Sequence, residues 1–494
     1  MGSSLDWQPK EGAGDFEVAT LKVPLDHREP GGEQIDLAVI RRRAADPARR
    51  IGSLVFVSGG PAFPGVTLLP AHYPFLPAEV RERFDVIGFD PRGAGESTPV
   101  QGFSSMQELG EFFGDLPLPF PVTEKEQRLW IDKFTAFAQI VRERNEKLLP
   151  HISSADIARD MDLLRQAVGE DTLNYLGVSF GSLPGITYAN LFPDRVRSMA
   201  LDATIDPVDW FTDDRDPTLN ATLRLGFDVS AARGVDRFLT LGGEAGPKAC
   251  AFAAEDAQAT RAKFRTMLER LRERPVTLAT PKGPQTVTYP IVIANLWVTL
   301  YQIGYWQAEA EILQEIWLAT ERPEEEGPLE TKLDVLESPA GTELPPLFAA
   351  PPEWSIAFLG GDTPNPSDPQ SWFAQGEIAE RRSGGMGSVV NWGSVACAAW
   401  TPSENRYIGP WDRPTAAPIL LIGTVGDPGT SYEATVELAG RLADARLLTV
   451  DGEGHSAFYN PNPHVAAALG AYFADGVLPE PGASVPPAHH PFPS

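Results

Sequence analysis

Short apolar runs, several of them rich in β-branched residues, recur in the N-terminal and C-terminal parts of the chain. Each has the length of a buried strand, and a polar or glycine-rich turn follows most of them. The runs cover residues 53–57, 84–89, 172–176 and 197–201, and then residues 417–423 and 445–450. Segments of helical character separate several of these runs. Strands that alternate with helices predict an α/β fold with a mostly parallel central sheet.

The middle of the chain has a different pattern, in which apolar residues recur at helical spacing. Residues 257–272 and 308–318 show it most clearly, and proline-rich breaks divide the pieces. We therefore expect a large, mainly helical cap inserted into the sheet, lying over its strand ends. An aromatic run is expected within one cap helix, with most of its members packed in the cap core: Trp297, Tyr301, Tyr305 and Trp306.

These patterns predict the organisation of the chain. Residues 1–207 form the first part of the core, with a helical insertion at about 104–150, and residues 208–400 form the cap. Residues 401–477 return to the core. The remaining residues, 478–494, are rich in proline, so we expect an extended strap or a disordered tail.

Composition excludes several classes of function. With 494 residues and 42% hydrophobic content the chain can bury a large core. No apolar run approaches the roughly 20 residues that cross a membrane. The net charge of -26 argues against nucleic acid and anionic membranes as partners. No Cys/His cluster has zinc spacing, so we expect neither metal nor cofactor, and the oligomeric state stays open.

One motif carries candidate chemistry at a predicted strand-to-helix junction. Gly177-Val178-Ser179-Phe180-Gly181 follows the strand at 172–176 and precedes a helix at 182–191. A G-x-S-x-G in that context is a nucleophile elbow, because the glycines allow the sharp turn that exposes the serine. Ser179 is therefore the expected nucleophile, and the Phe180 N–H is one expected oxyanion donor.

An acid and a histidine follow the serine in the order that such a nucleophile needs. Asp427 lies in the loop after the strand at 417–423, and His455 lies in the loop after the strand at 445–450. Both sites are at the carboxyl ends of predicted strands, where open α/β sheets collect functional groups. We expect His455 to act as general base and Asp427 to orient it. Asp451, at the end of a strand and directly before the histidine loop, is the rival acid.

A second glycine-rich loop, after the strand at 53–57, is the expected source of the other oxyanion donor. Its candidates are Gly60, Pro61 and Ala62, since adjacent glycines let a backbone approach a carbonyl closely. Neither this loop nor the turn at 90–97 has a Gly-Lys-Ser/Thr or G-x-G-x-x-G pattern, so nucleotide binding is not expected.

Taken together, these motifs resemble the prolyl and tripeptidyl aminopeptidase branch of the α/β-hydrolases. The resemblance rests on Gly59-Gly60-Pro61, the Asp90-Pro-Arg-Gly turn, the serine elbow, Gly426-Asp427-Pro428 and Gly454-His455, and it extends along most of the chain. Residues 21–26 resemble that family's N-terminal strand, and the part from about residue 390 resembles its terminal domain. The resemblance implies an α/β-hydrolase fold and release of N-terminal residues or short peptides.

Substrate recognition is less defined by the sequence. Phe63 adds bulk beside the expected oxyanion hole, where the family usually has glycine and serine. The resemblance also implies cap carboxylates that recognise an α-ammonium, for which Asp206 and Asp362 are the candidates. Either aspartate could instead cap a helix or a turn.

The sequence therefore predicts a serine hydrolase that cleaves an amide or ester through an acyl-enzyme, with a peptide or small molecule as its partner. Aminopeptidase-like activity is the first expectation. An esterase, lactonase or thioesterase acting on a small metabolite in a biosynthetic pathway is the alternative, because one triad serves all acyl transfers. A non-hydrolytic protein that retains the fold is the remote alternative.

Cysteine content bears on the compartment. Cys250 and Cys397 each lie in an apolar, alanine-rich setting, so we expect two free buried thiols rather than a disulfide. Two free thiols suit the cytoplasm. Secretion, with a signal peptide absent from this sequence, is the alternative.

Overall fold

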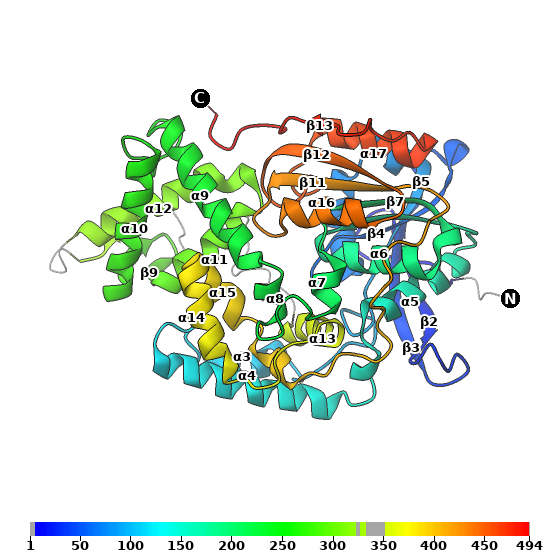
Figure 1. The fold of residues 1–494 in the computed structure, drawn as a ribbon, viewed down its shortest axis with the longest axis horizontal. Coiled ribbons are helices and arrows are strands. Elements are labelled where there is room, and N and C mark those ends of the chain that lie inside the picture. Colours follow the sequence, from blue (N-terminus) through cyan, green and yellow to red (C-terminus); the bar gives the residue numbers. More distant parts are fainter. Residues whose placement is uncertain (1–4, 323–326, 332–350, 494) are drawn as a thin grey trace.

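A ten-stranded sheet forms the centre of the computed structural model, which describes residues 5–322, 327–331 and 351–493 (Figure 1). The strand order is β1-β2-β3-β5-β4-β6-β7-β11-β12-β13. The antiparallel edge consists of β1 (Gln8–Pro9), β2 (Phe16–Pro24) and β3 (Gln34–Arg42), and β3 pairs antiparallel with β5. Every other pair in this sheet is parallel, as expected from the sequence. The parallel strands are β4 (Gly52–Val57), β5 (Phe84–Phe89), β6 (Leu173–Val178), β7 (Val196–Asp202), β11 (Ile419–Gly426), β12 (Ala445–Glu453) and β13 (Ser484–Val485).

Helices cover both faces of this sheet, which explains the continuous apolar runs in its strands. In β4, Leu54 and Phe56 pack in one hydrophobic cluster, while Val55 and Val57 pack in the other. The first cluster is covered by α1 (Gly65–His72), α2 (Ala78–Arg83) and α17 (Pro463–Asp475). The second is covered by α5 (Ser154–Ala167), α6 (Ser182–Leu191) and α16 (Tyr432–Arg441).

The described part of the segment between β7 and β11 is mainly helical, as expected for a cap (Figure 1). It also contains a small sheet of β8 (Val276–Thr280), β9 (Gly283–Val287) and β10 (Leu329–Glu330). Two of the proline-rich breaks expected from the sequence are at 323–327 and 345–346. Residues 323–326 and 345–346 lie outside the described residues. The cap helices are α7 (Pro207–Phe211), α8 (Ala221–Arg224), α9 (Phe227–Ala245), α10 (Ala257–Glu273), α11 (Tyr289–Leu300), α12 (Trp306–Glu321), α13 (Pro352–Asp362), α14 (Ser371–Ser383) and α15 (Gly385–Trp392).

The predicted insertion at about 104–150 packs against this cap. It forms α3 (Met106–Phe113) and α4 (Glu124–Arg144). The long helix α4 lies along the 3₁₀ turn at Val395–Ala399, and the Trp130 indole N–H donates to the Trp392 carbonyl at 2.9 Å. The cap is therefore built from two segments of the chain that are far apart in sequence.

The expectation that one helix carries the aromatic run 297–306 is wrong. Helix α11 ends at Leu300, a short 3₁₀ turn covers Ile303–Tyr305, and α12 begins at Trp306. At the end of α11 the Tyr301 carbonyl accepts the backbone N–H of His455 at 2.8 Å, a contact from a distant loop. Backbone groups that bond to another element are not available to continue a helix.

The proline-rich tail is an extended strap, one of the two predicted outcomes. Its strand β13 pairs with β12, and the Asn462 side-chain amide donates to the Pro486 carbonyl at 2.8 Å. Beyond this point Phe492 is buried, with its ring 5.5 Å from that of Phe238 and 6.1 Å from that of Trp306. The tail thus connects the edge of the core sheet to the cap.

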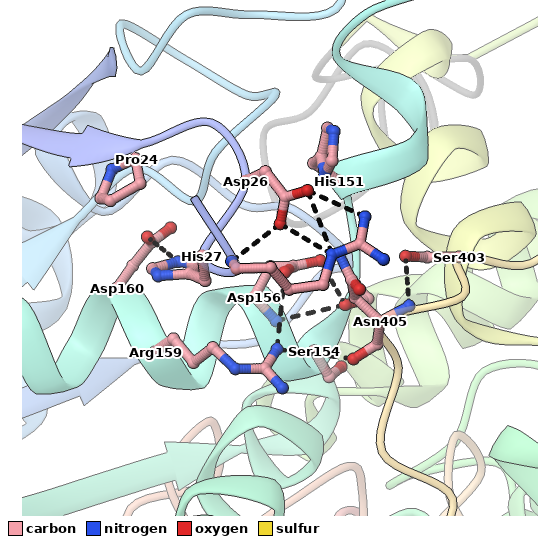
Figure 2. Close-up of polar contacts among 12 residues, drawn as sticks. Pro24, Asp26, His27, His151, Ser154, Asp156, Arg159, Asp160, Ser403 and Asn405 are labelled. Atoms are coloured by element: carbon pink, nitrogen blue, oxygen red, sulfur yellow. Dashed lines mark hydrogen bonds and ion pairs between the residues drawn. The ribbon is translucent and has the colours of Figure 1, made fainter. Parts of the chain in front are cut away.

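A buried ion pair fixes the turn after β5. Arg92 lies 2.6 Å from Asp160 of α5 and donates to the carbonyls of Pro24 and Leu25 at the end of β2. His27 contacts the same carboxylate at 2.9 Å, and Figure 2 shows the side chains of His27 and Asp160 next to each other. The Asp90-Pro-Arg-Gly turn therefore joins β2, β5 and α5.

Both cysteines are free and buried, as predicted. Burial raises the pKa of the Cys397 thiol to about 12 and also raises that of Cys250. Thiols with raised pKa values are poor nucleophiles, so these side chains act as small apolar residues. Among the helices that the structure describes, none is long and apolar enough to span a bilayer.

Candidate active site

Ser179 lies at the tight turn between β6 and α6, with a backbone φ of 55°. This left-handed conformation is strained for a serine and is typical of functional positions. The flanking glycines make the turn possible. A Cβ on Gly177 would lie 2.4 Å from the Gly181 carbonyl oxygen, and one on Gly181 would lie 2.5 Å from that of Val57. The motif therefore forms the predicted strand–turn–helix, with Ser179 at its apex.

The structure brings His455 and Asp427 together from separate strands. The His455 Nδ1 lies 2.9 and 3.0 Å from the two carboxylate oxygens of Asp427. Both side chains are buried. The rival acid, Asp451, is exposed on β12, and the contacts of the imidazole go to Asp427 instead. An imidazole whose Nδ1–H faces a carboxylate leaves Nε2 as its basic nitrogen.

Backbone groups fix the Asp427 carboxylate. It accepts the N–H groups of Gly429 at 2.7 Å, Thr430 at 2.9 Å and Ser456 at 3.2 Å. These donors hold the plane of the carboxylate and direct both oxygens toward Nδ1. The acid of the predicted triad is therefore set in place by its own loop and by the loop of the histidine.

Two tyrosines hold the imidazole ring. The Tyr301 ring from the cap is tilted over His455 at a centroid distance of 4.6 Å, and the Tyr459 ring stacks at 6.2 Å. The Tyr459 hydroxyl in turn donates to the Ser58 carbonyl at 2.6 Å, on the loop expected to hold the oxyanion. In the sequence Tyr301 belongs to an aromatic run, and no local pattern indicates that it lies beside the histidine.

Ser179 and His455 lie on the wall of one cavity of about 420 Å³. Phe180, Gly60 and Pro61 share this wall. Much of the remaining wall comes from the insertion and the cap, a contribution that the sequence did not reveal. It is largely apolar and aromatic: Met106, Leu109, Phe113, Leu116, Leu118, Trp130, Phe134, Trp210, Trp297, Ile356, Leu359, Val389 and Val390.

The loop after β4 lies against the nucleophile. A Cβ on Gly59 would lie 3.4 Å from the Ser179 Cβ, and Gly59 and Gly60 have φ values of 122° and 130° that favour glycine. Pro61 has no amide hydrogen, so it can shape an oxyanion hole but cannot donate to one. Ala62, with φ of 64°, is buried next to it.

The structure does not place the three predicted substrate-binding residues on the wall of this cavity. Asp206 caps α7 by accepting the Val208 N–H at 2.7 Å. Asp362 is fully buried and accepts the Ser154 N–H at 2.7 Å, and burial raises its pKa to about 6. Phe63 is partly buried and is not among the residues that line the cavity. Both aspartates thus have the capping or anchoring contacts that the sequence left open.

Residues 52–461 match the family model for the α/β hydrolase fold. The chain belongs to this family. It is 27% identical to serine protease Hip1 of Mycobacterium tuberculosis, over 98% of this chain and 91% of that protein. It is 29% identical to carboxylesterase B of the same organism (93% and 84% covered) and 26% identical to tripeptidyl aminopeptidase of Streptomyces lividans (95% and 83%).

These similarities confirm the resemblance to the aminopeptidase branch and make the chain a serine hydrolase, aminopeptidase-like or esterase-like. The comparisons do not support the remote alternative, a non-hydrolytic protein that retains the fold. They do not separate the peptidase class from the esterase class, because relatives of both kinds match at similar identity.

Proposed function

We propose that the protein hydrolyses carboxylic esters that have apolar acyl groups, through an acyl-enzyme on Ser179. One observation carries this choice. Within the described ranges, no Asp, Glu, Lys or Arg lies on the wall of the cavity that holds Ser179 and His455. An apolar acyl chain gains about 0.8 kcal/mol for each methylene buried in such a cavity.

The proposed chemistry follows from the positions of the polar groups. His455 Nε2 takes the proton from the Ser179 Oγ, which attacks the carbonyl carbon of the ester. Backbone N–H groups of Phe180 and of the loop at Gly60–Ala62 bind the resulting oxyanion. The imidazolium then returns its proton to the leaving alcohol, and water releases the acid by the same steps. Asp427 stabilises the imidazolium throughout.

Aminopeptidase-like activity is the second candidate, and the names of two relatives favour it. An α-ammonium inside the cavity would lose its hydration without gaining a carboxylate partner from the described lining. An unpaired buried charge costs several kcal/mol. The lining therefore supports ester hydrolysis over capture of a free amine.

A substrate panel tests this choice. The p-nitrophenyl esters of acetate, butyrate, octanoate and laurate are compared with proline, alanine and tripeptidyl anilides, with Ser179→Ala as control. We expect kcat/KM to rise with chain length until the cavity is filled, and we expect no anilide cleavage. Rapid cleavage of a free-amine anilide, blocked by N-acetylation, would move the protein to the aminopeptidase class.

We also propose that the protein works in a reducing compartment such as the cytoplasm. The two free, buried thiols support this, since the fold needs no oxidative step. Thiol titration of the denatured, unreduced protein checks it. Two titrated thiols fit the proposal, whereas none would indicate a disulfide and favour secretion.

A further inference from the structure

The three residues that follow His455 all donate their backbone N–H groups to carboxylates. The first, residue 456, donates to Asp427 at 3.2 Å. The second and third, residues 457 and 458, donate to the two oxygens of Asp202 at 3.3 and 2.9 Å. Residue 456 has a left-handed φ of 62°, a conformation that turns successive N–H groups toward one side as an anion-binding nest. Two different carboxylates therefore hold the histidine loop.

Asp202 comes from the end of β7, between the strand that leads to the nucleophile and the strand that leads to the acid. In the strand pairing, Asp202 is opposite Val178 of β6 and opposite Ile422 of β11. Its side chain is 2% exposed. Burial raises its pKa to about 7, while the loop N–H groups and His455 act in the opposite direction. The titratable groups whose charge interacts with it are His455, Asp427 and Tyr459.

A buried carboxylate normally has a cationic partner. Among the described residues, the groups that bond to the Asp202 oxygens are backbone N–H groups, and the charged neighbour that favours its ionised form is His455. The cation that can compensate its charge is the imidazolium of His455, which forms during the proposed reaction. The ionised form of Asp202 is therefore most favourable when His455 carries its proton.

We propose that Asp202 is a positioning residue for His455, which it fixes through the loop and stabilises as the imidazolium. This rests on the proposed function, in which His455 is the general base. In the proposed reaction the Asp202 side chain contacts neither the substrate nor the reacting atoms. It acts through the histidine, as a second carboxylate in addition to Asp427.

The test is Asp202→Asn, with Asp156→Asn as a matched control. Asp156 is also a fully buried carboxyl whose pKa burial raises, but it lies on α5 at the start of the helix. We expect Asp202→Asn to lower kcat about tenfold with little change in KM, less than the roughly 10²–10⁴-fold that acid–base catalysis contributes. We also expect the acidic limb of the pH profile of kcat/KM to move to lower pH, because a negative charge near His455 is lost. The shift is smaller than the loss of a fully ionised neighbour would cause, because Asp202 with its pKa of about 7 is only partly ionised across that limb.

The control variant is expected to keep the kcat and the acidic limb of the wild type, even if its thermal midpoint falls. Unchanged kcat and an unchanged limb in folded Asp202→Asn would overturn the proposal. An equal effect in both variants would overturn it too, since it would show general destabilisation. Failure of the proposed function gives a different result, because the wild type would then cleave free-amine anilides instead of esters, and both variants would be compared with it on the anilide.

Discussion

Replacing Asp427 by asparagine is expected to abolish most of the activity while leaving the fold intact. One carboxylate oxygen accepts the N–H groups of Gly429 and Thr430, so the asparagine oxygen takes that position. The amide nitrogen then takes the other position, where it faces His455 Nδ1 and the N–H of Ser456. The amide oxygen still lies 2.9 Å from Nδ1, but the amide N–H group now faces that nitrogen and the negative charge is gone. Both changes favour the tautomer with the ring proton on Nε2, which cannot accept the proton of the nucleophile.

The size of the effect follows from that change of tautomer. Loss of the correct tautomer in a serine–histidine–acid site costs about 10⁴-fold in kcat. This corresponds to about 5.5 kcal/mol of transition-state stabilisation. The stability cost is smaller, about 1–3 kcal/mol, because one buried N–H loses its acceptor. The assay is kcat on p-nitrophenyl butyrate at saturating substrate, with the thermal midpoint measured in parallel.

Asp451→Asn is the matched control, since this exposed aspartate is the other acid near the histidine loop in sequence. It is expected to keep kcat within about twofold, as surface changes away from the site do. An Asp427→Asn variant that kept more than about a tenth of the wild-type kcat would show that Asp427 does not set the tautomer of His455. A collapse of activity in Asp451→Asn would contradict that role of Asp427 as well.

Three further outcomes test other parts of the structure. Phe492→Ala removes a buried ring of the tail strap and should lower the free energy of unfolding by about 3 kcal/mol in urea denaturation. Burial raises the pKa of Glu309 to about 7, above its unfolded value, so its contribution to stability is largest at low pH and is lost as pH rises through about 7. Glu309→Gln should therefore gain stability relative to the wild type between about pH 5 and pH 8 in the same assay. Trp130→Ala enlarges the cavity and should raise kcat/KM for longer acyl esters about fourfold for each added methylene that gains room.

The sequence predicted the parts of this molecule that depend on local pattern. Strands buried on both faces have continuous apolar runs, so the strand at 84–89 matches β5 at both ends. The elbow was predictable from its glycines. A side chain at Gly177 or Gly181 would clash with a backbone carbonyl, so the turn requires glycine at both positions and the sequence shows it. Asp427 was predictable by its place after a strand, and its contact with His455 follows from the neighbouring positions of β11 and β12 in the sheet.

What could not be predicted depends on contacts between distant segments. The cavity is built where the insertion packs against the cap, and neither Trp130 nor Val389 has a local signal for that role. The carbonyl at the end of α11 accepts the His455 N–H, which lies in another part of the chain. Asp202 follows a strand like many capping aspartates, and its contacts to the histidine loop become visible only in three dimensions.

Covalent labelling measures whether Ser179 is an activated nucleophile, the property on which the proposed reaction depends. The native protein is treated with a fluorophosphonate, digested, and mapped by mass spectrometry. We expect one adduct, on the peptide that contains Ser179, and no adduct in Ser179→Ala or in heat-denatured protein. Absence of the adduct in folded protein, or equal labelling of native protein and Ser179→Ala, would show that Ser179 is not an activated nucleophile.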